Sequence, residues 1–210
     1  MAIPPELPEG ELLFQILHFI APVSAALRED LASCLKQEHY PRKHVLVRPG
    51  EVARKVWFIR EGFARAWYLD RDGREHTTWF MGPGDFMISV YSFFTQQPAA
   101  EQVELLADSR LLSITWSQLQ SLYADHPEFN FHGRVLTQKY YIQSEERAVL
   151  LRTRDPAERY QLLLDRHPGL LQQASLGQIA SFLSITPETL SRIRAGRAGN
   201  NASSTLKRHL

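Results

Sequence analysis

The chain has 210 residues, of which 44% are hydrophobic and 22% are charged, a composition typical of a globular protein with one large domain or a mid-sized and a small one. The formal net charge is +1, but residues 1–150 carry 15 Lys and Arg against 19 Asp and Glu, whereas residues 151–210 carry 9 against 4. Since a polyanion binds a cationic surface, any such partner is expected at the C-terminal end.

The composition also excludes several classes of protein. Cys34 is the only cysteine, so neither a disulfide within the chain nor an iron–sulfur (Fe-S) cluster held by about four thiolates can form. The N-terminus lacks a basic stretch followed by an apolar one, and no apolar run approaches the roughly 18–20 residues that span a bilayer. We therefore expect a cytoplasmic protein with no membrane partner.

Two short amphipathic helices are predicted near the N-terminus, over residues 11–20 and 24–37, with Ser24 capping the second. From about residue 41 to 115 the pattern changes to short apolar segments with turns at roughly ten-residue spacing, which is typical of an all-β barrel or a jelly roll. The predicted strands are 44–47, 56–59, 63–69, 76–81, 103–106 and 111–114.

A long helix is predicted over residues 128–150, because Val135, Ile142 and Val149 recur every seven residues with Leu136 beside them. A helix of about 20 residues is some 30 Å long, too long to be covered by one small β domain. The economical arrangement is a homodimer in which two such helices pair about a two-fold axis. The alternative is a long helix that packs only on its own chain.

Beyond a boundary at Arg154-Asp155-Pro156, the pattern predicts a helix over 157–167, a second over 175–183 and a third that begins after Thr186 with Pro187 at its first position. The last two are joined by a turn of few residues, as in a helix-turn-helix. Its outer face is polar, and the candidate DNA-binding residues are Thr186, Glu188, Thr189, Ser191, Arg192, Arg194 and Arg197. The alternative is a helical hairpin with a solvated charged face.

Each outer side chain has a chemistry suited to DNA. The first turn of the third helix is expected in the major groove, where Arg192 can donate two hydrogen bonds to guanine and Glu188 can accept one from the amino group of cytosine. Arg194 and Arg197 are more suited to phosphates.

The helix-turn-helix segment resembles the signature of the Crp/Fnr family, which has Ile-Ala-x-x-Leu-Gly, a Ser or Thr cap and Glu-Thr-x-x-Arg. The matching residues are Ile179-Ala180, Leu183, Thr186, Glu188-Thr189 and Arg192. Turns of the N-terminal half are similar to those of the cyclic-nucleotide-binding β-roll of that family, at Arg48–Glu51, Phe58–Gly62, Asp72–Glu75 and Gly82–Phe86.

The resemblance implies a homodimer whose sensor domain responds to a small effector and repositions two helices on a palindromic operator in double-stranded DNA, with RNA polymerase as a further candidate partner. It also implies base contacts by Glu188 and Arg192, with Thr189 near phosphate or base. Pro187 stands where cyclic-AMP-responding members often have Arg. The segments Glu158–Tyr160, His167-Pro168 and Ile185–Glu188 are most similar to the branch common in Bacteroidetes.

The effector site departs from the family pattern. Its degenerate phosphate cassette is formed by Gly84, Asp85, Ser89, Tyr91, Ala99 and Ala100. The Arg-Ser pair that would bind a cyclic phosphate falls on Ala99-Ala100, and burying a phosphate without an arginine is costly. We therefore expect no binding of cAMP or cGMP in the usual way, no metal, and an unidentified effector. Tyr91, Phe93 and Phe94 either line an apolar pocket or belong to ordinary core packing.

The C-terminus departs as well. Gly196 is expected to end the third helix, and the Gly/Asn/Ser-rich residues after it are expected to form a flexible basic tail without the usual β-hairpin wing. Ser184 stands where glycine often makes the helix turn, which is tolerable if its backbone stays out of the left-handed region.

The predicted fold class is α+β: a sensor domain with the jelly-roll (double-stranded β-helix) fold over residues 1–127, a dimerisation helix over 128–153, and a winged-helix-like helix-turn-helix with the wing missing over 154–210. The predicted function is sequence-specific transcription regulation. The alternative is a sensor or protein-interaction module that does not bind DNA. An enzyme is not expected, since no catalytic motif is present; His44, Glu75 and His76 are the only strand residues suited to a metal.

Overall fold

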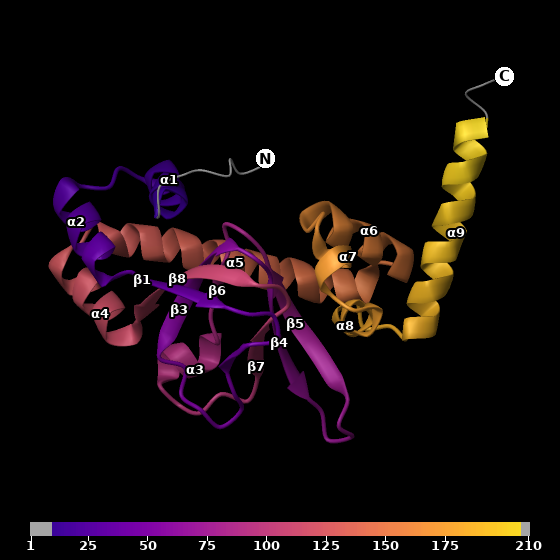
Figure 1. The fold of residues 1–210 in the computed structure, drawn as a ribbon, viewed down its shortest axis with the longest axis horizontal. Coiled ribbons are helices and arrows are strands. Elements are labelled where there is room, and N and C mark those ends of the chain that lie inside the picture. The colour runs from indigo at the N-terminus through magenta and orange to yellow at the C-terminus, as the bar shows by residue number, and fades with distance from the viewer. Residues whose placement is uncertain (1–9, 207–210) are drawn as a thin grey trace.

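The computed structural model describes residues 10–206, and the side chains of residues 10–196. A helix pair leads into a region of strands, which is followed by one long helix and a group of shorter helices (Figure 1). The helices are α1 (Glu11–Ile20), α2 (Ala25–Cys34), α3 (Val90–Thr95), α4 (Trp116–Asp125), α5 (Phe129–Thr153), α6 (Pro156–Arg166), α7 (Leu170–Gln173), α8 (Leu176–Phe182) and α9 (Pro187–Leu206). The strands are β1 (Lys36–Tyr40), β2 (Val45–Val47), β3 (Lys55–Glu61), β4 (Ala64–Leu69), β5 (Glu75–Met81), β6 (Phe86–Met87), β7 (Gln102–Leu105) and β8 (Ser109–Thr115).

The strands form two antiparallel sheets with the orders β1-β8-β3-β6 and β2-β7-β4-β5, which we call the roll. Trp57, Ile59 and Val103 are among the side chains that fill the space between the sheets. Phe58, which points the other way from β3, packs against α1, α2 and α4. Strand β3 is thus buried on both faces, which explains its uninterrupted apolar sequence. The α+β fold with a jelly roll is confirmed.

Helix α5 runs from the roll to the C-terminal helices, as Figure 1 shows. Its inner face packs through Leu136 and Tyr140 onto the cores of the N-terminal part. On its outer face, Ile142 is 56% and Val149 is 55% exposed, and Val135 is half-buried. The seven-residue stripe is therefore accessible in the single chain.

Helices α6 to α9, which we call the helical unit, share a core with the roll. Tyr160, Ile179 and Leu190 of the unit pack with Phe80 of β5 and with Leu106 beside β7. All five side chains are at most 4% exposed. Burying an aromatic or aliphatic side chain stabilises by roughly 1.5–3 kcal/mol, so the unit is held against the roll by apolar burial.

All six predicted strands form, but two strands and three helices were not predicted. The second helix ends at Cys34 rather than at residue 37, because Lys36–Tyr40 joins the sheet as β1 beside β8. Helices α3, α4 and α7 and the two-residue strand β6 are the others. The predicted domain boundaries stay a prediction.

The expectation that Gly196 ends the last helix was wrong, because α9 continues to Leu206. Gly196 does not take the left-handed conformation that a helix stop needs, and its neighbourhood is open. An interior glycine costs a helix only about 1 kcal/mol relative to alanine, and Ala195 and Ala198 beside it favour the helix. Within the described residues, no strand follows α8.

Candidate nucleic-acid interface and effector cavity

Helix α8 begins at a capping box. The Ser175 Oγ accepts a hydrogen bond from the Gln178 amide at 3.2 Å, and the Gln178 Oε1 accepts one from the Ser175 amide at 2.8 Å. Ile179 and Ala180 then face the core with 0% and 1% of their surface exposed. The backbone N–H groups of Ser175 and Gln178 thus both have hydrogen-bond acceptors, which fixes the residue at which the helix starts.

The turn after α8 has the hydrogen bonds of a Schellman motif. The Ile185 amide donates to the Ala180 carbonyl at 3.0 Å, and the Ser184 amide donates to the Ser181 carbonyl at 3.1 Å. Ser184 lies in the left-handed region with φ of 54°, in the position that glycine usually occupies. The sequence analysis had expected the backbone of Ser184 to stay out of the left-handed region. The motif's own hydrogen bonds and the packing of Ile185 in the shared core hold this conformation.

Replacing Ser184 by glycine is expected to raise the free energy of unfolding by about 0.5–1 kcal/mol, because glycine adopts this conformation without steric cost but has more freedom in the unfolded chain. Urea denaturation measures the change. The matched variant Ser184→Ala keeps the strain and is expected to be no more stable than the wild type. A less stable Ser184→Gly protein would contradict the argument.

Helix α9 starts where the sequence predicted. The Thr186 Oγ1 accepts a hydrogen bond from the Thr189 amide at 3.2 Å, and Pro187 occupies the first helical position. Hydrogen bonds from its own amide and from the Thr186 hydroxyl lower the pKa of Glu188, and the charge of Arg192 adds to this. Glu188 is therefore ionised at neutral pH and can only accept hydrogen bonds.

The outer face of α9 is exposed as far as residue 196, the last residue whose side chain the structure describes. Glu188, Ser191, Arg192 and Arg194 are exposed, as is Thr186 at the cap, and Thr189 is partly buried. Within the described residues, neither Arg192 nor Arg194 donates a hydrogen bond to another side chain or to the backbone. The side chain of Arg197 lies outside the described residues. Six of the seven candidate DNA-binding residues thus lie together at the start of α9. Two of them, Arg192 and Arg194, have guanidinium groups without a hydrogen-bond partner in the described residues.

Two arginines that the sequence reasoning missed, the partly buried Arg147 and the buried Arg159, bind the last carbonyls at the end of α8. The Arg147 Nη2 of α5 donates to the Phe182 carbonyl at 2.8 Å, and the Arg159 Nη1 of α6 donates to the Leu183 carbonyl at 2.7 Å. Cations at a helix C-terminus also interact favourably with its dipole. The available signal was Arg147 itself, a charge seven residues after Tyr140 on the inner face of α5.

The predicted phosphate cassette contains no cation. Ala99 is 5% exposed, and its backbone pairs with Gly50 and Glu51. Glu101 stands beside it, and burial raises the pKa of its carboxyl even though the Ser89 hydroxyl donates to it. A cyclic phosphate would meet an alanine and a carboxyl group here, in place of a guanidinium.

The other cassette residues have different surroundings. Gly84 and Asp85 form a turn that hydrogen-bonds to Ile59, with Gly84 at φ of 88°. The Asp85 carboxylate accepts a bond from the Gly82 amide at 3.1 Å and lies 3.9 Å from the Lys139 ammonium of α5. Ala100 is exposed at the far end of the cassette, and Tyr91 on α3 is 65% exposed.

An apolar cavity of about 430 Å³ lies between the roll and α5. Phe93 and Phe94 are among its lining residues and Tyr91 is not. Phe93, with 0% of its surface exposed, also belongs to the core of the roll, so the two alternatives given for these rings stay open. The Tyr140 hydroxyl accepts a hydrogen bond from the Phe86 amide at 2.9 Å, and burial together with the Asp85 charge raises its pKa. This neutral hydroxyl is one of few polar groups in the lining.

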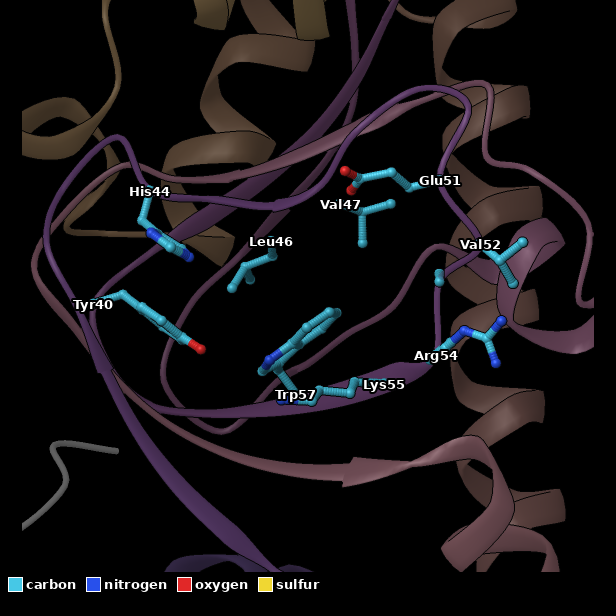
Figure 2. Close-up of a pocket in the computed structure, with 10 residues that line it drawn as sticks. Tyr40, His44, Leu46, Val47, Glu51, Val52, Arg54, Lys55 and Trp57 are labelled. Atoms are coloured by element: carbon cyan, nitrogen blue, oxygen red, sulfur yellow. The ribbon is translucent and has the colours of Figure 1, made fainter.

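A smaller cavity of about 240 Å³ opens at another end of the roll (Figure 2). The rings of Tyr40 and His44 stack with centroids 4.0 Å apart on one side, and Trp57 lies at the floor. The Lys55 ammonium lies 2.6 Å from the buried Glu38 carboxylate. Burial alone would raise the pKa of this carboxyl, but hydrogen bonds from Lys55, Trp57 and Ser113 and the charge of Lys55 together lower it. Glu38 therefore neutralises Lys55, whereas Arg54, the other cationic residue of the lining, is exposed.

In residues 10–206, no group of three or more His, Cys, Asp or Glu side chains is arranged to hold a metal ion. The candidate metal residue His76 instead hydrogen-bonds to Asp70 at 2.8 Å. No helix among the described residues is long and apolar enough to cross a membrane.

The sequence is related to known regulators. The model of the cyclic nucleotide-binding domain matches residues 37–126. A CRP-like cAMP-activated global transcriptional regulator of Mycobacterium tuberculosis is 29% identical over 100 residues, which are 48% of this chain and 44% of that protein. The chain is thus matched over less than half the length of this curated relative.

Solved structures share the fold over most of the chain. FixK2 of Bradyrhizobium japonicum has a TM-score of 0.71 at 20% identity, covering 80% of this chain and 86% of its own. The c-di-GMP-responsive global regulator CLP of Xanthomonas campestris has a TM-score of 0.67 at 18% identity, covering 85% and 93%. Residues 37–126 are therefore similar to the cyclic nucleotide-binding domain, and the chain is a relative of the CRP-like regulators with the fold of the Crp/Fnr family.

Proposed function

We propose that the chain is a sequence-specific DNA-binding transcription regulator. The observation that carries this is the start of α9, where Arg192 and Arg194 are exposed and donate no hydrogen bond within the described residues, beside the ionised Glu188. The start of an α-helix fits the major groove of DNA. A guanidinium group that donates two hydrogen bonds, next to a carboxylate that accepts them, can distinguish one base pair from another. The excess of basic residues after residue 150 supports the same function. A regulator of this kind works in the cytoplasm of a bacterium, with RNA polymerase as a further partner.

The proposal includes a homodimer that pairs through α5. The supporting observation is that Ile142 and Val149 are more than half exposed on a helix of 25 residues, and Tyr141 beside them is 65% exposed. Aliphatic residues repeated every seven positions are the pattern of a parallel helix pair. Two helical units related by a two-fold axis then read a palindromic operator in double-stranded DNA.

The proposed sensor does not use cAMP or cGMP in the usual way, because Ala99 replaces the arginine and Glu101 stands beside it. We place an effector in the apolar cavity against α5, whose lining suits an uncharged ligand. Titration calorimetry of the protein with cAMP is expected to show no binding at micromolar concentration. Micromolar affinity in that titration would sink this part of the proposal.

The experiment that tests DNA binding is selection of sites from a random duplex pool, followed by affinity measurements at several salt concentrations. We expect a two-fold symmetric site with half-sites about 34–36 Å apart. The logarithm of the affinity should fall with the logarithm of the salt concentration by about 0.9 for each phosphate contacted. A folded dimer that enriches no sequence and shows no salt-dependent affinity would favour the alternative, a sensor or protein-interaction module.

A further inference from the structure

Strand β5 is the outer strand of its sheet, and three backbone groups on its free edge, at Glu75 and Thr77, are bound by side chains from helices. The Thr77 amide donates to the Ser181 Oγ at 2.8 Å, and the Ser181 hydroxyl donates to the Glu75 carbonyl at 2.7 Å. The Thr77 carbonyl accepts from the Arg147 Nη2 at 3.1 Å. Ser181 of α8 and Arg147 of α5 thus take the place of a neighbouring strand. We call these hydrogen bonds the edge contact.

Arg147 joins three elements through one guanidinium group. The same Nη2 that binds β5 also donates to the Phe182 carbonyl at the end of α8, and the group lies 4.3 Å from the centre of the Phe182 ring. Within residues 10–196 it has no carboxylate partner, and its Nε has no hydrogen-bond partner. The described hydrogen-bond partners of Arg147 are the Thr77 carbonyl of the roll and the Phe182 carbonyl at the end of α8. The position of its guanidinium group therefore depends on the position of the roll relative to the helical unit.

Apolar packing lies next to the edge contact. The rings of Phe80 on β5 and Phe182 on α8 have centroids 5.1 Å apart, and Phe80 is 1% exposed. The outer side chains Glu188 and Arg192 are exposed in the same arrangement. The helical unit is therefore docked on the roll with its candidate DNA-reading face uncovered.

We infer that Ser181 and Arg147 are positioning residues that determine which half-site spacing the dimer accepts. The inference rests on the proposed function. In a two-fold dimer, the separation of the two recognition helices is fixed only if each helical unit is fixed on its roll. Loss of the edge contact lets each unit move, so operators with other spacings are bound with little further loss. Neither residue touches DNA, so base preference within a half-site stays unchanged.

The test compares the full-length wild type with Ser181→Ala, which removes one hydroxyl, and with the matched control Ser33→Ala, whose hydroxyl donates to the Asp30 carbonyl within α2. Each protein binds duplexes with the selected spacing, with one or two base pairs inserted, and with a single half-site. We expect the wild type and Ser33→Ala to lose at least about tenfold in affinity when the spacing changes, since a rigid dimer then engages only one half-site well. Ser181→Ala should lose about threefold or less while binding the single half-site normally. Full spacing discrimination by Ser181→Ala would overturn the inference.

A second readout does not depend on DNA. The Thr77 amide is hydrogen-bonded to Ser181, so its hydrogen exchange should be at least about tenfold faster in Ser181→Ala than in the wild type and Ser33→Ala. Unchanged exchange would show that the contact does not hold the edge and would contradict the inference. If the wild type bound no DNA at all while the exchange changed as expected, the proposed function would fail and the edge contact would stand.

Discussion

Replacing Arg192 by alanine is expected to abolish the base preference at one position of each half-site and to weaken operator binding by about 10² to 10⁴ fold. A bidentate contact from arginine to guanine discriminates by about 1–3 kcal/mol, and a dimer makes the contact twice. The effect should be this large because Arg192 is exposed and has no hydrogen bond within the described chain to maintain. Selection from a random duplex pool, repeated with the variant, measures both the preference and the affinity.

The control is Arg110→Ala, which removes an exposed arginine of β8 near Glu61, far from α9 in the sequence. It changes the net charge equally, so any general electrostatic loss appears in both variants. Arg194→Ala provides a second comparison, because a phosphate contact weakens binding to all sequences alike and reduces the salt slope by about one per contact. If Arg192→Ala kept the wild-type base preference, Arg192 would not lie on a base edge.

Replacing Ile142 by glutamate is expected to dissociate the proposed dimer. Near the two-fold axis of a parallel helix pair, residues at the same position face each other, so two carboxylates would be brought together out of water. Desolvation costs several kcal/mol for each ion, and each 1.4 kcal/mol is a factor of ten in the dissociation constant. We expect the dissociation constant to rise by about 10³ fold or more, measured by sedimentation velocity.

The side chain of Ile142 is 56% exposed in the single chain, so the glutamate variant should fold. Ile142→Leu keeps the position apolar and is the matched control, with the dimer retained. The monomeric variant should bind a single half-site about as well as the wild type binds it, and lose only the advantage of the palindrome. A dimer of unchanged stability in Ile142→Glu would mean that α5 pairs through another face or not at all.

Local patterns were sufficient to predict much of the fold. The six apolar strand segments, the long helix and the caps at Ser24 and Thr186 were predicted from periodicity and from side chains that act within one turn. Strand β1 was missed because its sequence is polar, and its one buried side chain, Glu38, is buried as an ion pair with Lys55. Helix α4 could have been predicted, since Thr115 and Gln118 have the spacing of a capping box.

The candidate site was predicted only where it lies on one helix. The spacing of Glu188 and Arg192 follows from helical geometry, so the sequence was enough to put them on one face. The contact of Ser181 with Glu75 joins residues 106 positions apart, and one of its two partner groups is a backbone carbonyl, which every residue carries. No pattern of side chains encodes such a contact. Arg147 and Arg159 were missed for the same reason, because both donate to carbonyls.

The cover on the edge of β5 also bears on the solubility of the protein. An open edge strand offers unpaired N–H and C=O groups to any other strand and so promotes aggregation, which proteins prevent by covering the edge. Here the cover is the helical unit itself, through Ser181, with Arg147 beside it. A substitution that frees the unit to move also uncovers a template for strand pairing between molecules. For the proposed regulator, aggregation as well as the geometry of an operator therefore limits how far the helical unit can move.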